Sequence, residues 1–295
     1  MYNKNEKFPT IGEYKVDYYK TVNRFTEIRK QSWIKEQLHF DYEILFNIVK
    51  SILIHPIDAR TEKVKYDKKN NGIFHCENST VETILGYYHL EKFLNENKLP
   101  LNTSPNDRAV LSCDHHALLF VSFLRYLGIP ARVRTGYCTY IVDGLIIPHW
   151  ISEVFNEKER EWIIVDPERQ IVKVEKKSFL FAPTVWKNHM EYGKCYSSYS
   201  GFSGRQGLKY ALLCDLNCIF KNELLSYEWR LKAHNRNKPV IARTSYERLS
   251  DIDRKTFDKT ATLMLDPDDN MDELWDLYSR IVENQDIQTS SYNKM

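Results

Sequence analysis

Two neighbouring stretches of the chain decide the fold. Residues 113–137 read CDHHALLFVSFLRYLGIPARVRTGY, and residues 149–168 read HWISEVFNEKEREWIIVDPE. The first has apolar residues at helical spacing, then Gly128 and Pro130, which end a helix, and then the alternation of a strand. The second has two short strand-like runs joined by the polar loop NEKER, which predicts a β-hairpin. We therefore expect a helix followed by an antiparallel sheet.

Cys113 is a candidate nucleophile because of its place in this pattern. It stands at the start of the predicted helix, where free backbone N–H groups and the helix dipole favour a thiolate. The thiolate is the form of cysteine that attacks a carbonyl carbon. The alternative is a buried structural cysteine.

The predicted hairpin can supply a base and a group that orients it. We expect Phe155 to pair with Arg160 across the loop. In that register His149 lies directly opposite Asp166, with Cβ atoms roughly 5 Å apart. His149 would take the thiol proton, and Asp166 would hold the ring and stabilise the imidazolium. A one-residue slip would spoil this pairing, and a structural histidine and a turn residue before Pro167 are the alternatives.

Taken together, the two stretches resemble the transglutaminase-like superfamily. Its members carry a Cys at a helix start, a helix ending in Arg-x-x-Gly-Ile-Pro-Ala-Arg, a His followed by Glu-Val, and Trp-x-x-x-Asp-Pro. The match covers about residues 108–168. On this resemblance, Cys113, His149 and Asp166 fall on the three catalytic positions. The flanking residues look like a bacterial subgroup of the superfamily.

The resemblance implies an α+β fold, in which a papain-like core packs one nucleophile helix on an antiparallel sheet with helical extensions. We expect this core, with N-terminal helices, over residues 20–175. A mostly helical C-terminal extension packed on the core is expected over residues 176–295. Apolar spacing predicts further helices. They cover residues 41–54, residues 81–96 with Thr80 as N-cap, residues 207–225 and residues 270–284.

Aromatic side chains are the candidate substrate-binding residues. Tyr137 and Tyr140 follow the nucleophile helix on the predicted strand, and core packing is their alternative. Trp150 directly follows His149, whereas many relatives have an alanine between the two, so the aromatic ring is on the other strand face. The backbone N–H of Cys113 is a natural donor to an oxyanion.

Composition argues against several other classes of protein. The chain has 42 basic and 40 acidic residues, so no net field favours nucleic acid or an anionic membrane. No stretch approaches the roughly 20 apolar residues of a membrane span, and the N-terminus lacks the apolar region of a signal peptide. We therefore expect a cytoplasmic protein whose six cysteines are free thiols.

A bound metal or cofactor is not expected. No second close cysteine pair completes a zinc site with Cys214 and Cys218. The adjacent side chains of His115 and His116 point about 100° apart on a helix and cannot both face one ion easily. Residues 266–277 lack the glycine and the final glutamate of a calcium loop.

Three functions fit the sequence. The first is a cysteine hydrolase or acyltransferase that forms a thioester with an amide or peptide carbonyl, with hydrolysis slightly favoured because water is always present. The second is a binding or scaffold protein on a catalytically retired transglutaminase-like fold. The third is an amide-forming tailoring enzyme in a small-molecule pathway. The expected partner is a peptide, a protein or a small amide substrate.

Overall fold

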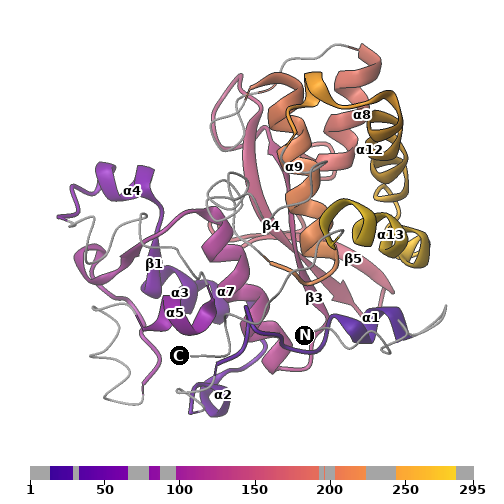
Figure 1. Ribbon diagram of the computed structural model, residues 1–295. Helices are drawn as coiled ribbons and strands as arrows, with labels where there is room; N and C mark the ends of the chain where they lie inside the picture. Colours follow the sequence, from indigo (N-terminus) through magenta and orange to yellow (C-terminus); the bar gives the residue numbers. More distant parts are fainter. Residues whose placement is uncertain are drawn as a thin grey trace, which may run out of the picture.

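A five-stranded antiparallel sheet forms the centre of the computed structural model, which describes residues 14–28, 33–65, 80–86, 98–192, 196, 203–223 and 244–283. The strand order is β6-β5-β4-β3-β7. Helix α7 (Cys113–Tyr126) packs on this sheet (Figure 1), which confirms the predicted α+β core. The strands are β3 (Ala131–Cys138), β4 (Ile147–Asn156), β5 (Glu161–Asp166), β6 (Ile171–Val172) and β7 (Phe179–Phe181).

Helices lie on both sides of the sheet. On one side, to the left in Figure 1, are α3 (Tyr42–Ile52), α4 (Pro56–Thr61), α5 (Val81–Leu85) and α7. On the other side are α8 (Ala182–Tyr192), α9 (Gly204–Ile219), α12 (Asp251–Leu263) and α13 (Met271–Tyr278). The short elements are α1 (Tyr14–Tyr18), α2 (Ile34–Gln37), the parallel pair β1 (Leu53–Ile54) and β2 (Ala109–Val110), 3₁₀ turns at Pro105–Asp107 and Tyr246–Arg248, and a π-helical turn at Ser279–Glu283.

Helix α7 begins and ends where the sequence predicts. Ser112 is extended, with φ −82° and ψ 177°, and α7 begins at the next residue. Gly128, two residues beyond the end of α7, has φ +74°, the left-handed conformation that glycine adopts most easily. The chain then enters β3, whose alternate residues face α7 and the opposite layer.

The β4–β5 hairpin forms, but the predicted register is wrong. Phe155 pairs with Trp162 and not with Arg160, so each strand is offset by one residue and the loop keeps its length. The side chain of Asn156 accepts hydrogen bonds from the N–H groups of the two residues at 158 and 159, and Arg160 takes a positive φ of 53°. This local turn fixes the register. Asp166 therefore lies diagonally to His149 on the same face.

The other predicted helices form with different lengths. Thr80 caps α5 as predicted, because its hydroxyl accepts the N–H of Thr83; residues 87–96 of that prediction lie outside the described residues. Helix α9 ends at Ile219, short of residue 225, because Lys221 has φ +54° and leaves the helical conformation. Helix α3 agrees with the prediction for residues 41–54 to within two residues at each end.

Sequence analysis missed strand β7, which lies beyond residue 175 yet pairs with β3. It is three residues long, which is too short for alternation to show. The close approach of β7 to β3 depends on Gly136 of β3, because a Cβ atom at this position would lie 2.2 Å from the carbonyl oxygen of Leu180. The segment after residue 175 therefore supplies both a strand and several helices to the fold.

Buried ion pairs join the sheet to the C-terminal helices. Arg134 of β3 makes a bidentate contact with Asp215 of α9, at 2.8 and 2.9 Å. The neighbouring Arg132 binds Glu153 at 2.7 Å and Asp268 at 2.6 Å. Every one of these charges has a partner, as buried charges require. Asp268 belongs to the acidic stretch 266–277, and its side chain pairs with Arg132.

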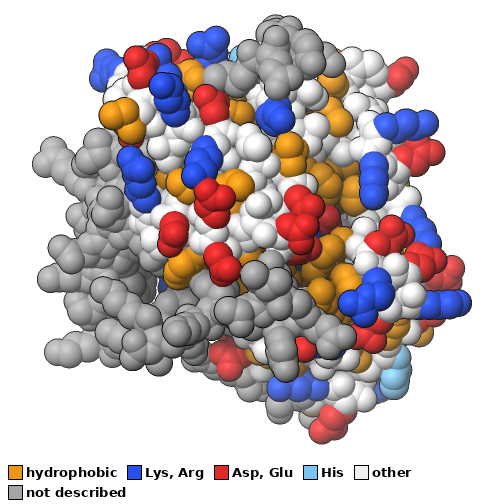
Figure 2. Space-filling view, turned by 90° about the vertical axis from the view of Figure 1, so that its right-hand side faces the viewer, with side chains coloured by type: hydrophobic (Ala, Val, Ile, Leu, Met, Phe, Trp, Pro, Cys, Tyr) orange, Lys and Arg blue, Asp and Glu red, His pale blue; other side chains and the backbone are white. Residues whose placement is uncertain are grey.

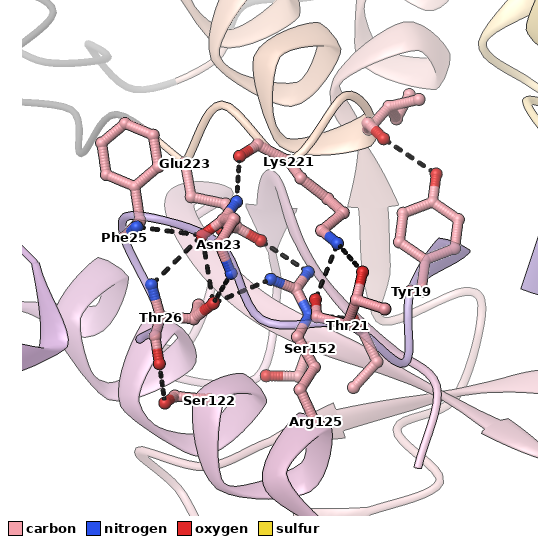
Figure 3. A network of polar contacts seen from close by, with 12 residues as sticks. Tyr19, Thr21, Asn23, Phe25, Thr26, Ser122, Arg125, Ser152, Lys221 and Glu223 are labelled. Carbon is pink, nitrogen blue, oxygen red and sulfur yellow. Dashed lines mark hydrogen bonds and ion pairs between the residues drawn. The ribbon is translucent and has the colours of Figure 1, made fainter. Parts of the chain in front are cut away.

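A second polar network fixes the N-terminal segment against the core (Figure 3). The guanidinium of Arg125, on α7, forms an ion pair with Glu223 at 2.6 Å, and both side chains are fully buried. Asn23 donates to Glu223 at 3.1 Å, and Lys221 donates to the backbone carbonyl of Thr21 at 2.7 Å. Segments about 200 residues apart in the sequence are thereby held together.

The face formed by the C-terminal helices carries charges of both signs. Figure 2 shows Lys and Arg side chains interspersed with Asp and Glu side chains on this face, with apolar side chains between them. Such mixing agrees with the formal net charge of +2. Within the described part of the chain, no helix has the length and apolar character that crossing a membrane requires.

The substitution Glu223→Gln is expected to destabilise the protein by about 3–5 kcal/mol, because it leaves the buried guanidinium of Arg125 without its counter-charge. Urea unfolding measures the change. The control is Glu159→Gln, which removes an exposed ion pair with Lys173 and should cost less than about 1 kcal/mol. Equal losses in the two variants would contradict the role given to the buried pair.

Candidate active site

Cys113 is the first residue of α7 and the partly exposed cysteine among those described. The backbone N–H of Trp150, on β4, is hydrogen-bonded to its sulfur. The other described cysteines are buried free thiols, namely Cys138, Cys214 and Cys218. Cys76 and Cys195 lie outside the described residues. Access to solvent therefore singles out the thiol that the sequence proposed as the nucleophile.

The surroundings of Cys113 favour a neutral thiol. The sulfur is largely removed from water, and this raises the pKa of the thiol well above its ordinary value. The negative charges of Glu168 and Asp114 raise this pKa further. The hydrogen bond from the N–H of Trp150 lowers the pKa of the thiol, but this effect is smaller than the two that raise it. The expected effect of the helix N-terminus is outweighed, so the thiol needs a base to become a thiolate.

His149 and Asp166 form a close, buried contact between an imidazole and a carboxylate. Nε2 of His149 lies 2.8 Å from Oδ2 of Asp166, and both side chains are buried. Burial lowers the pKa of His149, but the charge of Asp166 and its hydrogen bond outweigh burial and leave this pKa raised. With Nε2 held by Asp166, Nδ1 is the nitrogen left to exchange a proton with the sulfur.

Asp166 is held as a carboxylate by four donors. Oδ2 accepts from His149 and from the hydroxyl of Tyr140, the latter at 2.7 Å. Oδ1 accepts from the backbone N–H groups of Glu168 and Arg169, both at 3.0 Å. Burial raises the pKa of Asp166, but the neighbouring His149 and these hydrogen bonds overcome burial and lower it. The carboxylate can therefore orient the imidazole without taking its proton.

Glu168 is a site residue that the sequence analysis did not identify. One of its carboxyl oxygens lies within 4.8 Å of the sulfur of Cys113 and of a ring nitrogen of His149. The correct register would have found it: continued past the end of β5, the ladder that pairs Ser152 with Val165 puts Glu168 opposite His149. The predicted register instead put Asp166 at that position.

Glu168 is buried and only half satisfied. Its side chain is 3% exposed, and one of its oxygens forms an ion pair with Arg169 at 2.8 Å. Its Oε2 has no hydrogen-bond partner among the described residues. Burial raises the pKa of Glu168 to about 7, although the neighbouring His149 and Arg169 lower it. A charge of this kind costs stability, and such groups cluster at functional sites.

Of the predicted substrate-binding residues, Tyr140 lies at the His149–Asp166 pair. It is partly exposed, donates to Asp166, and its ring meets the ring of His149 edge-on at 6.2 Å between centroids. Tyr137 and Trp150 are buried, with exposures of 0% and 3%, in the main hydrophobic core. The structure therefore places these two side chains in the core, the alternative stated for the tyrosines.

The two histidines that follow Cys113 on α7 are both buried. His115 pairs with Asp114 at 2.7 Å. Nδ1 of His116 lies 3.0 Å from the carbonyl oxygen of Ser112. Burial lowers the pKa of His116 to about 3, so this ring is neutral. Both rings support the start of α7.

A cavity of about 500 Å³ lies beside Glu168. Its wall includes Glu168, which lies near Cys113, and His116 of α7, but not Cys113 itself. Most of the wall is polar and contains charges of both signs. The lining residues are Lys50, Leu53, Ile54, His55, Asp58, Thr61, Glu62, Pro105, Arg108, His116, Glu168, Arg169 and Gln170. Such a cavity suits a polar ligand.

Cys113, His149 and Glu168 could also hold a metal ion, because one donor atom from each lies within 4.8 Å of the others. Thiolate, imidazole and carboxylate are the ligands that Zn²⁺ prefers. An ion there would occupy the sulfur and the ring nitrogen that acyl transfer needs. The expectation that the enzyme works without a metal stays a prediction.

Comparison with known proteins finds one family match, and it covers most of this site. The family model described as "Transglutaminase-like superfamily" matches residues 58–167. No curated protein and no solved structure matches the chain. The match includes Cys113, His149 and Asp166 and ends one residue before Glu168. The resemblance to a bacterial subgroup stays a prediction.

The substitution Glu168→Gln is expected to stabilise the protein at pH 8 by roughly 1–3 kcal/mol. The pKa of Glu168 is raised to about 7 in the folded protein, from 4.5, so the folded state binds more protons than the unfolded state between these values. Stability should therefore fall as pH rises through this window, and the variant should lose this dependence. Thermal unfolding at pH 5 and pH 8 measures both effects; a variant that is less stable at pH 8 would contradict the assignment.

Proposed function

Because residues 58–167 belong to the transglutaminase-like superfamily, we propose that this chain is a cysteine-nucleophile enzyme acting on an amide or peptide carbonyl through a thioester. The observation that carries the proposal is the 2.8 Å contact of His149 with Asp166 beside a partly exposed thiol. A retired scaffold has no need of a buried imidazole–carboxylate pair beside a cysteine. The scaffold alternative therefore has less support.

In the proposed reaction, neutral His149 takes the proton of Cys113 as the sulfur attacks the carbonyl carbon. The charge that forms on the carbonyl oxygen is stabilised by the backbone N–H of Cys113 at the start of α7. The imidazolium then protonates the leaving amine, and the acyl group remains on the sulfur as a thioester. Asp166 stabilises the imidazolium throughout.

A neutral resting thiol shapes this mechanism. Because burial and nearby carboxylates raise the pKa of Cys113, the thiolate forms as the proton moves to His149 and does not exist beforehand. The polar cavity beside Glu168 supports a polar peptide or small amide as substrate. A cytoplasmic location and an amide-forming role in a small-molecule pathway stay predictions.

Treatment with p-nitrophenyl acetate is expected to add one acetyl group to the protein, on Cys113, because this thiol is partly exposed and has a base beside it. Intact mass and peptide mapping measure the adduct. Cys113→Ala should remove it, whereas Cys218→Ala, which alters a buried thiol, should retain it. Acetylation spread over several cysteines would contradict an activated nucleophile.

Asp166→Asn is expected to slow acetylation roughly 10²–10⁴-fold and to shift its pH profile to lower pH. Asp166 raises the pKa of His149 against burial, so its removal leaves burial to lower this pKa. The rate of acetylation as a function of pH measures the shift. Tyr140→Phe removes a hydrogen bond to Asp166 but keeps the charge, so its shift should be smaller. A profile in Asp166→Asn that moves to higher pH would count against the pair.

A further inference from the structure

The cavity beside Glu168 has two basic side chains on its wall that the proposed mechanism does not use. Lys50 lies in the last turn of α3, and Arg108 directly follows the 3₁₀ turn at Pro105–Asp107. The helices α3 and α4 lie on the same side of the sheet as α7 (Figure 1). A carboxyl oxygen of Glu168 lies within 4.8 Å of the sulfur of Cys113, so the acyl chain of a thioester on this sulfur can enter the cavity.

Arg108 is a partly buried cation without an ion pair among the described residues. Its Nε and Nη2 both donate to the backbone carbonyl oxygen of Thr103, at 3.0 and 2.6 Å. Its Nη1 makes no hydrogen bond with a described residue. Burial lowers the pKa of Arg108, and the charge of Glu62 acts in the opposite direction. A cation in such surroundings is stabilised by an anion that binds to it.

Most other titratable groups on the wall are either paired or neutral. Asp58 and Glu168 both pair with Arg169, at 3.6 and 2.8 Å. Burial lowers the pKa of His55 to about 4 and that of His116 to about 3, so neither imidazole carries a charge near neutral pH. These five residues therefore neither compensate nor strengthen the charge of Arg108.

The charges left on the wall favour an anion. Lys50 and Glu62 are both exposed, and neither forms an ion pair with a described residue. Two positive charges, on Lys50 and Arg108, thus face the single negative charge of Glu62. Glu62 weakens the attraction for an anion but does not cancel it.

We infer that Arg108, together with Lys50, binds a carboxylate of the substrate, so that the preferred substrate carries a carboxylate beyond its reacting carbonyl group. The inference rests on the proposed function and names its substrate class. One carboxylate oxygen can accept from Arg108 and the other from the flexible ammonium group of Lys50. A single negative charge suits the wall better than the double charge of a phosphate, because Glu62 and Asp58 also line the cavity.

The test compares esters that differ only in the charge at the far end of the acyl chain. The full chain is treated with the p-nitrophenyl monoesters of adipic, pimelic and suberic acid, and with the matching esters that end in a carboxamide. Release of p-nitrophenolate gives the second-order rate constant of acylation, and peptide mapping confirms the adduct on Cys113. In the wild type, at one or more of these lengths, we expect the carboxylate ester to react about 10–100-fold faster than its carboxamide partner, the worth of a hydrogen bond to a charged group.

The variants assign this preference to the wall of the cavity. Arg108→Gln should abolish it, and Arg108→Lys, which keeps the charge but not the planar fork, should retain part of it. Lys50→Gln should lower the ratio of the two rates about 2–5-fold, and Glu62→Gln should raise it by a similar factor, because both charges are exposed. The control is Arg60→Gln, which removes an exposed arginine of α4 that does not line the cavity and should keep the wild-type ratio.

The outcomes separate the inference from the function on which it rests. A wild type without the preference at any of the three lengths, or a preference that survives in Arg108→Gln, would overturn the carboxylate site and leave the cysteine enzyme standing. If Arg108→Gln does not fold, Lys50→Gln and Glu62→Gln decide the matter, and equal ratios in these two variants would also overturn the site. A wild type that neither these esters nor p-nitrophenyl acetate acylates on Cys113 would overturn the proposed function and the inference with it.

Discussion

The register of the β4–β5 hairpin is the constraint on which the candidate site depends. The Asn156 side chain and the positive φ of Arg160 set the turn, and the ladder that follows puts Ser152 opposite Val165. Asp166 is then diagonal to His149, close enough for a 2.8 Å contact, and Glu168 falls beside the same ring. A local turn far from the nucleophile thus determines which carboxyl groups meet the imidazole.

Buried charge is compensated unevenly across the molecule. Around the sheet and its C-terminal helices, Arg132 and Arg134 are fully paired with carboxylates, and Arg125 is paired with Glu223. At the site, Asp166 is also satisfied, but Glu168 is not. Because the other buried charges named here are paired, the half-satisfied carboxyl group of Glu168 points to a functional role, since groups of this kind cluster at functional sites.

Sequence analysis predicts most of this fold and part of the site, and the reasons are local. The start of α7, its end at Gly128 and the existence of the hairpin follow from short-range patterns. The register of the hairpin does not follow from such patterns. Moving the loop by one residue along each strand leaves every side chain on the same face of the sheet, so the apolar pattern fits both registers equally well. Glu168 was missed for that reason. Strand β7 was missed because it is three residues long and depends on Gly136, a long-range close approach.

Glu168 acts on both groups that exchange a proton in the proposed reaction. Its charge raises the pKa of the Cys113 thiol, so it opposes formation of the thiolate. The same charge raises the pKa of His149, so it favours the imidazolium. Glu168 therefore disfavours a free thiolate beside neutral His149 but supports the imidazolium that forms when the proton moves from sulfur to nitrogen. In the proposed reaction this proton transfer belongs to the attack on the carbonyl carbon and does not precede it.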